Sequence, residues 1–511
     1  MAQVERRDEK IAFAVISVAV IILSFNAFIR PYTLYQSFWT NWVWADQFVD
    51  QLRAGHVYPR WLPLSHGGLG APVFYYYPPL SFYVAGLLGL AGMSAYFAVL
   101  GTFSVALWLS GLAMYQWLKG WTVHPLLASL FYMAAPYHIF DFYRRGALAE
   151  MMAIAFIPLV ALGLKRISEG RNGTVAAISF AAMILSHLPL ALLALVFLVI
   201  PYSLFLTRGQ PSSLIRLIIP ICTGVALSAV YIVPALALEP YRDGAHLWEE
   251  AQLVPSSWGL FFSGSGVPRV FAALILGTTL SIVLGSAIIA FKWRAGWSLY
   301  AIACCIVILG LIPGFWSLPL VKQVQFPFRA IPFAEFGLAT ALALVPRREF
   351  VGLIAVVPAL LLSIAFNGPH LEKKAPTIAF LARHHPDALE YLPRGVASVD
   401  WNADWNLNML DGRSPPPSVA GRTIEPIFYF PAWEVACQGK RVRTFPDPQT
   451  KLLSYFGNHC EARLTKTTPE MVGFAVTVLT LASLILSFFW RRLNRNTGKR
   501  ALHPGHEMSQ G

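Results

Sequence analysis

Apolar runs of about 20 residues recur along the chain, and this is the length that an α-helix needs to cross a bilayer. The predicted spans are residues 11–29, 95–117, 123–140, 147–164, 174–188, 189–206, 214–237, 268–291, 296–314, 328–345, 349–366 and 470–490. Composition agrees, since 56% of the 511 residues are hydrophobic and 13% are charged, against about 25% charged residues in soluble domains. We therefore predict an all-α polytopic membrane protein with about 12 transmembrane helices.

Basic residues determine the predicted orientation, because Lys and Arg collect on the cytoplasmic side of membrane proteins. The net charge of +13 fits such loops better than a nucleic-acid partner, and none is predicted. The basic loop 165–171 lies inside only if the short apolar run 79–93 dips into the outer interface without crossing. Both termini are then cytoplasmic, residues 1–366 form the membrane module, and residues 30–94 form one outer loop.

We predict that residues 367–469 form a soluble domain on the outer side, before the last helix and basic tail at 470–511. Short aromatic or alternating runs flank the turn Gln438–Gly439–Lys440, so we expect a hairpin in a small β-rich domain. Cys437 and Cys460 lie in this domain, and a cysteine pair in an oxidising compartment predicts a disulfide.

The first outer loop carries an unusual group of charges. Asp46, Asp50 and Arg53 share one face if the segment is helical. Asp50 can pair with Arg53, which leaves Asp46 without an obvious local partner. A carboxylate in this position can act as general base on an acceptor hydroxyl or amine, and the alternative is a solvated helix face.

Three further residues of this loop are candidate substrate contacts: Arg60, His66 and Tyr77. Arg60 could bind a phosphate, and the glycines after His66 let backbone approach a ligand closely. Aromatic rings such as Tyr77 can stack on sugars or lie in the interfacial belt. A tight interfacial loop shaped by glycine and proline explains the same residues, so both interpretations stay open.

Arginines on the outer side run against the charge bias, which points to a ligand or a buried partner. Arg144 and Arg145 could clamp a phosphate with their planar forks, with Glu150 holding one arginine in place. The alternative is a structural Arg145–Glu150 pair. Arg329 lies at the outer end of the predicted span 328–345. It could add a phosphate contact, or its side chain could snorkel to the lipid headgroups. His187 lies at an outer turn without partners at ligand spacing, so no metal site is predicted.

The order of these stretches resembles the polytopic glycosyltransferases of the GT-C fold. It is especially similar to a bacterial group of membrane proteins labelled as related to 6-pyruvoyl-tetrahydropterin synthase. The matching stretches are Asp46, 55–61, 77–80, 145–150, His187, 325–329 and 430–433. The resemblance implies that Asp46 is the catalytic base and that Arg144, Arg145 and Arg329 hold the donor phosphate. The chain departs from the pattern at residues 47–49, where relatives often carry a histidine. Some members use a divalent metal, so the resemblance allows one without requiring it; no cofactor is certain.

The resemblance implies a multi-pass enzyme of the bacterial inner membrane with its active site on the periplasmic side. It would move a sugar from a polyprenyl-phosphate donor to a glycan, lipid or protein acceptor, and direct displacement would invert the anomeric centre. One alternative is a transporter or flippase of lipid-linked saccharide, which would spread charges through mid-membrane positions. A second alternative is a non-catalytic envelope assembly factor that binds a partner through its soluble domain.

Overall fold

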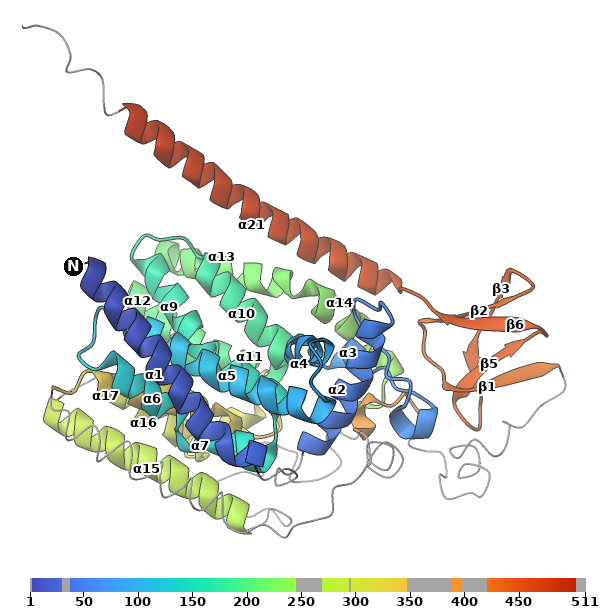
Figure 1. Ribbon diagram of the computed structural model, residues 1–511, viewed down its shortest axis with the longest axis horizontal. Helices are drawn as coiled ribbons and strands as arrows, with labels where there is room; N and C mark the ends of the chain where they lie inside the picture. The colour runs from blue at the N-terminus through green and yellow to red at the C-terminus, as the bar shows by residue number, and fades with distance from the viewer. Residues whose placement is uncertain are drawn as a thin grey trace, which may run out of the picture.

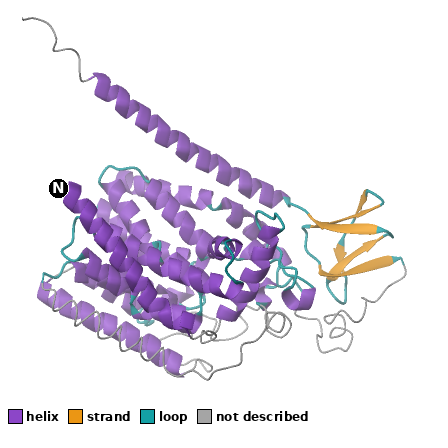
Figure 2. Ribbon diagram, viewed as in Figure 1, coloured by secondary structure: helices purple, strands orange, loops and turns teal. Residues whose placement is uncertain are grey.

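The computed structural model describes residues 2–29, 37–244, 269–293, 296–346, 388–396 and 421–501. Its helices form one bundle, and a small β domain stands at one end of that bundle (Figures 1 and 2). The start of α1 (Ala2–Ile29) and the far end of α21 (Thr468–Ala501) both lie away from the β domain (Figure 1). The predicted topology requires this arrangement, because it places both ends of the chain opposite the soluble domain.

The elements follow in chain order. Before residue 245 the remaining helices are α2 (Ser37–Arg53), η1 (Ser65–Gly68), α3 (Val73–Tyr76), α4 (Leu80–Leu90), α5 (Ala95–Leu118), α6 (Pro125–Met133), α7 (Pro136–Phe140), η2 (Asp141–Arg145), α8 (Leu148–Ile154), α9 (Ile157–Ser168), α10 (Thr174–Ser186), α11 (Leu188–Ala194), η3 (Leu195–Val199), α12 (Ile200–Thr207), α13 (Pro211–Leu227), α14 (Ala229–Ala237) and η4 (Glu239–Tyr241). After residue 268 they are α15 (Arg269–Trp293), α16 (Gly296–Ile308), η8 (Phe315–Ser317), η9 (Val321–Val324), η10 (Pro327–Ala330), α17 (Ile331–Ala343) and η11 (Leu389–Tyr391). The strands are β1 (Arg422–Phe428), β2 (Trp433–Cys437), β3 (Lys440–Val442), β4 (Phe445–Pro446), β5 (Leu452–Phe456) and β6 (Cys460–Leu464).

Within the described residues, six helices are long and apolar enough to cross a membrane, and α13 with α14 makes a seventh if their 69° bend lies within one span. The six are Arg6–Ile29, Ala95–Leu118, Leu148–Ser168, Leu188–Thr207, Ile275–Trp293 and Thr468–Trp490. The predicted count of about 12 spans is therefore not confirmed.

The remaining predicted spans differ from the structure for physical reasons. α10, α16 and α17 have 13 residues each, about 20 Å of helix where the hydrocarbon core measures about 30 Å. The predicted span 349–366 lies outside the described residues. The run 79–93 forms α4, whose 11 residues are about half of what a crossing needs.

A proline divides the predicted span 123–140 into α6 and α7. Ala135 is extended, with φ −60° and ψ 146°, because the ring of a following proline disfavours helical backbone at the preceding residue. Pro136 then begins α7 and the chain runs directly into η2. This break turns residues 137–150 toward the middle of the bundle, where they contribute to the site described below.

α5 is the central helix of the first half, in contact with α1, α2, α4, α6, α8 and α9. α4 packs closely on α2 because glycines face it. A Cβ added at Gly86 would lie 2.6 Å from Leu52 Cδ1, and one at Gly89 would lie 2.6 Å from Val49 Cγ2. The run 79–93 is thereby held beside the start of the outer loop.

The β domain consists of two three-stranded antiparallel sheets, ordered β1-β5-β4 and β3-β2-β6. The predicted hairpin joins β2 to β3 through Gln438 and Gly439, whose φ angles of 49° and 79° suit a tight two-residue turn. The predicted disulfide, Cys437–Cys460, joins directly opposed residues of β2 and β6. A small β-rich domain is therefore present, as the sequence predicted.

Aromatic side chains of this domain pack against residues of the first outer loop. The ring of Phe430 lies 6.1 Å from that of Trp61 and 4.6 Å from that of Tyr75, centroid to centroid. Trp433 meets Trp61 edge to face at 5.4 Å. Two stretches that carried the family resemblance, 55–61 and 430–433, thus form one interface between bundle and β domain.

Candidate functional site

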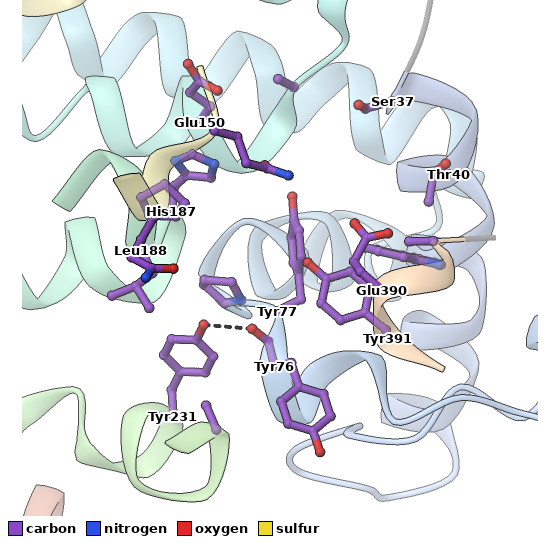
Figure 3. Close-up of a pocket in the computed structure, with 18 of the residues that line it drawn as sticks. Ser37, Thr40, Tyr76, Tyr77, Glu150, His187, Leu188, Tyr231, Glu390 and Tyr391 are labelled. Atoms are coloured by element: carbon purple, nitrogen blue, oxygen red, sulfur yellow. Dashed lines mark hydrogen bonds between the residues drawn. The ribbon is translucent and has the colours of Figure 1, made fainter. Parts of the chain in front are cut away.

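A cavity of about 460 Å³ opens between the helices of the bundle (Figure 3). It is lined by residues of α2, of the stretch 76–78, of α14 and of the stretches 145–150, 187–189, 323–329 and 388–391. These segments are distant in sequence, and the breaks between helices expose their polar side chains to the same space. One wall of the cavity is charged and another is aromatic.

Glu150 organises the charged wall. Its Oε2 accepts from Arg145 Nη1 at 2.7 Å and from Arg329 Nε at 3.2 Å, while Oε1 accepts from the Tyr137 hydroxyl at 2.6 Å. Glu150 is 1% exposed, so the carboxylate has no competing water and holds both guanidinium groups at fixed positions. The predicted Arg145–Glu150 pair is present, and Arg329 joins it from 179 residues away.

Both arginines keep donors for a ligand. Toward the described residues, Arg145 uses only Nη1, which also donates to Asp141 Oδ1 at 2.7 Å. Arg329 uses Nε and Nη1, the latter to the Val324 carbonyl at 2.7 Å. A guanidinium carries five N–H donors, and the Nη2 groups of these two cavity-lining residues have no hydrogen-bond partner among the described residues. Burial raises the pKa of Asp141, and the charge of Glu150 raises it further, although Arg145 lowers it.

His187 lies on the same wall and begins α11. Its Nδ1 accepts from the Leu190 amide at 3.2 Å, so a neutral imidazole carries its proton on Nε2. Figure 3 places His187 beside Glu150. The histidine can therefore offer a neutral donor next to the two arginines.

The aromatic wall combines three segments. The rings of Trp44 and Tyr77 lie 5.2 Å apart, and Tyr391 lies 5.8 Å from Trp44 and 5.9 Å from Tyr77. All three pairs meet edge to face, the arrangement that aromatic quadrupoles favour. Such a wall presents a rigid apolar surface with hydroxyl groups at its edge.

The predicted site residues divide into two groups. Tyr77, Arg145, Glu150, His187 and Arg329 line the cavity. The other four, Asp46, Arg60, His66 and Arg144, are not among the residues that line it.

Asp46 lies in a second, smaller hollow of about 270 Å³, together with Trp42, Arg53 and Tyr96. The face of α2 toward the main cavity carries Ser37, Thr40, Asn41 and Trp44. Asp46 follows Trp44 by two residues, about 200° around the helix axis, and so points away from that cavity. Burial raises the pKa of Asp46, the charge of Asp50 adds to this, and Arg53 lowers it. The predicted Asp50–Arg53 pair is confirmed, at 3.1 Å.

Arg60 has a structural partner in place of the predicted phosphate. Its Nε lies 2.9 Å from Glu470 Oε1, and its Nη2 donates to the Val230 carbonyl at 2.8 Å. The guanidinium carbon also lies 3.7 Å from the Tyr58 ring centroid. Arg60 thus ties the first outer loop to the beginning of α21.

His66 and Arg144 also lie elsewhere. His66 adopts a left-handed conformation, with φ 52°, and its ring meets Phe428 of β1 with centroids 6.1 Å apart. This places His66 under the β domain. Arg144 is half-buried in η2, one residue before the arginine that enters the cavity.

Sequence reasoning missed several cavity residues. Asn41 and Trp44 could have been found from the sequence, because together with Ser37 they repeat at helical spacing and so share one face of a helix. Glu390 and Tyr391 could not, since they come from the predicted soluble segment. Among the described residues, no group of three His, Cys, Asp or Glu side chains could hold a metal ion, so the structure does not assign a site to a divalent metal.

No protein-family model and no curated protein matches the chain. Among solved structures it is similar to the mycobacterial arabinofuranosyltransferase AftD, at a TM-score of 0.45 and 17% identity over 70% of this chain and 26% of that one. It is also similar to ArnT from Cupriavidus metallidurans bound to undecaprenyl phosphate, at 0.41 and 13% over 69% and 62%. A third neighbour is the Archaeoglobus fulgidus oligosaccharyltransferase in complex with Zn and sulfate, at 0.37 and 13% over 70% and 53%.

These neighbours are glycosyltransferases of the GT-C class. The chain spans about a quarter of AftD and less than two thirds of the other two. The narrower resemblance, to the group labelled as 6-pyruvoyl-tetrahydropterin synthase-related, is not shown by these comparisons. With TM-scores below 0.5, the likeness carries no argument about activity, which has to come from the cavity.

Proposed function

We propose that the protein is a membrane glycosyltransferase that takes a sugar from a polyprenyl-phosphate donor and passes it to a glycan, lipid or protein acceptor. The observation that carries this proposal is the pair of arginines, Arg145 and Arg329, held at one cavity wall by a single glutamate. The pair opens onto a space whose facing wall is aromatic.

The two walls suit the two ends of such a donor. Planar guanidinium forks match phosphate oxygens better than an ammonium group does, and the Nη2 groups of both arginines have no partner among the described residues. The aromatic wall of Trp44, Tyr77 and Tyr391 offers a surface on which a sugar ring can pack. The cavity volume, about 460 Å³, lies within the usual range for small-molecule sites.

Transfer would follow from this placement. An acceptor oxygen attacks the anomeric carbon, the bond from that carbon to the phosphate oxygen breaks, and the lipid phosphate leaves with the electron pair. Donors that are already oriented stabilise the charge that develops on the leaving oxygen, which is the role we give to Arg145 and Arg329. The acceptor proton goes to a carboxylate. The sequence assigned this role to Asp46, which stays a prediction.

We further propose that the cavity faces the periplasm of a bacterial inner membrane, with both termini cytoplasmic. The β domain carries the Cys437–Cys460 disulfide, and such bonds persist in oxidising compartments. It packs on the outer loop that also lines the cavity. Cysteine labelling from outside the cell, with accessible sites in β3 and inaccessible sites in loop 165–171, is the expected result.

The proposal is tested by the binding of undecaprenyl phosphate to the purified protein. Arg145→Lys and Arg329→Lys keep a positive charge but lose the fork, and each should weaken binding about 10-fold or more, since a charge-assisted hydrogen bond contributes about 1.5–3 kcal/mol. Arg144→Ala is the matched control, because it removes the neighbouring arginine of η2 that does not line the cavity.

Thermal denaturation in detergent would show whether each variant is folded, since Arg145 also pairs with Asp141. Equal affinity for the wild type and both lysine variants would contradict the phosphate site. A loss of affinity in Arg144→Ala as large as in Arg145→Lys would contradict the assignment to the cavity.

A further inference from the structure

The second hollow, of about 270 Å³, lies on the side of α2 that faces away from the main cavity. α2 lines it with Trp42, Asp46, Val49 and Arg53, whose spacing places them on one stripe of the helix. Residues 93–97, which link α4 to α5 and begin α5, complete the lining. The three helices pack together at this place (Figure 1). The hollow is therefore separate from the site described above.

Asp46 brings an uncompensated charge to this hollow. Its side chain is partly buried, and its carboxylate makes no hydrogen bond or ion pair with any residue that the structure describes. Burial raises the pKa of Asp46, the charge of Asp50 raises it further, and Arg53 offsets these effects only in part. A cation bound beside the carboxylate would remove this penalty, because an opposite charge favours the ionised form.

The surroundings of the carboxylate indicate which kind of cation would fit. The rings of Trp42 and Tyr96 meet edge to face with centroids 5.2 Å apart, and Met93 and Phe97 add apolar surface to the lining. Calcium and magnesium take about six or more oxygen ligands, which such a lining does not resemble. An organic ammonium group suits it better, because aromatic rings attract cations and a carboxylate accepts charge-assisted hydrogen bonds.

A site for an anion lies one helical turn from Asp46. Arg53 Nη1 is 3.1 Å from Asp50 Oδ1, and Arg53 Nη2 donates to the Gly89 carbonyl at 3.1 Å. These contacts place the guanidinium beside residue 50, about 6 Å along the helix axis from Asp46, and leave it further N–H donors. Ser94 adds a hydroxyl that is exposed and makes no capping hydrogen bond.

The hollow lies at a surface of the membrane. α5 is long and apolar enough to cross the bilayer, and its first residues line the hollow. Phe97, in the lining, and Leu90, at the end of α4, expose apolar side chains beside it. A ligand that reaches this place from the bilayer can pack its acyl chains on this apolar surface while its polar headgroup enters the hollow.

We propose that the hollow binds a phospholipid whose headgroup carries a primary ammonium, namely phosphatidylethanolamine. The ammonium donates to the Asp46 carboxylate beside the aromatic rings, and the phosphate lies near Arg53 and Ser94. The two-carbon link of ethanolamine joins these two positions. The lipid comes from the leaflet in which α5 begins. This site goes beyond the proposed function and does not depend on it, because it lies on the opposite side of α2 from the cavity.

The test compares phosphatidylethanolamine with phosphatidylglycerol of identical acyl chains, bound to the full-length protein and measured by native mass spectrometry. Wild type should prefer the ethanolamine lipid about 10-fold, the effect of one charge-assisted hydrogen bond. Asp46→Asn should abolish this preference, and it should fold, because it removes a carboxylate that lacks a partner. Asp50→Asn is the matched control. It removes the same charge one turn along α2, outside the lining, and should keep the preference within about 3-fold, because exposed charges contribute little.

Four results would overturn the proposal. The first is equal binding of the two lipids by wild type. The second is an unchanged preference in Asp46→Asn, which would leave Asp46 only the role predicted from the sequence. The third is a loss in Asp50→Asn as large as in Asp46→Asn, because the preference would then reflect the general negative charge of α2. The fourth is displacement of the bound lipid by an equal concentration of phosphoethanolamine without acyl chains, which would exclude a membrane lipid as the specific ligand.

Discussion

The ion pair between Arg60 and Glu470 predicts a large and specific loss of stability. Arg60 Nε and Glu470 Oε1 are 2.9 Å apart, and their side chains are 6% and 10% exposed. Replacing Arg60 by methionine keeps most of the side-chain volume but leaves a buried carboxylate without its cation. Breaking a buried pair in this way costs about 3–5 kcal/mol.

The lower part of that range applies here, because Glu470 keeps other partners. Its Oε2 accepts from the amide and the hydroxyl of Thr467, each at 2.8 Å, which is the reciprocal contact of a capping box at the start of α21. We therefore expect Arg60→Met to lower the free energy of unfolding by about 3 kcal/mol. Glu470→Gln keeps an oxygen for Thr467 but leaves the Arg60 cation unpaired, and should cost about 2 kcal/mol.

The double variant Arg60→Met/Glu470→Gln removes both charges together. It should lie within about 1–2 kcal/mol of wild type, so the coupling energy of the double-mutant cycle should be about 3 kcal/mol. The assay is unfolding in mixed detergent micelles. Its progress is monitored by proteolysis of the chain at the junction between the β domain and α21.

The same variants decide between two roles for Arg60. A structural anchor predicts that the double variant binds undecaprenyl phosphate as wild type does, because the pair lies outside the cavity. A 10-fold loss of lipid binding in a stable double variant would refute this reasoning and restore the phosphate contact that the sequence suggested. A coupling energy below about 0.5 kcal/mol would equally refute the buried pair.

Three further predictions concern stability. Burial penalises the ionised form of Asp46 and raises its pKa, so Asp46→Asn should raise the melting temperature at pH 7.5. The gain should vanish at pH 3, because the carboxyl is then protonated in the unfolded chain as well, below its ordinary pKa of about 3.9. A gain that does not change with pH would exclude this cause. Replacing Cys437 and Cys460 by alanine, which opens a loop of 23 residues, should lower the free energy of unfolding of the β domain by about 3 kcal/mol, as measured by proteolysis under non-reducing conditions. Gly89→Leu should lower the free energy of unfolding by about 1–3 kcal/mol, because the new side chain overpacks against Val49. At Gly92 a Cβ meets no atom within 4 Å, but φ is +102°. Gly92→Ala should therefore lower the free energy of unfolding only by its backbone strain, about 1 kcal/mol.

Sequence alone determined the features that depend on neighbours along the chain. Apolar runs identified membrane helices because the bilayer sets a length. The Asp50–Arg53 pair followed from helical spacing, and the hairpin at Gln438 and Gly439 from turn chemistry. The contact of Arg145 with Glu150 also spans only five residues. In each case the physical cause acts within one or two turns of chain.

Tertiary structure decided which of these residues share a cavity. Asp46 faces away from it because packing fixes the rotation of α2, and spacing along the helix cannot say which face points inward. Arg329 pairs with Glu150, 179 residues before it in the chain, and Arg60 pairs with Glu470, 410 residues after it. The ring of Tyr391 meets that of Tyr77 because hydrogen bonds hold η11 beside the end of η4. Such contacts depend on helix breaks and packing distributed over the whole chain, so no local pattern of residues encodes them.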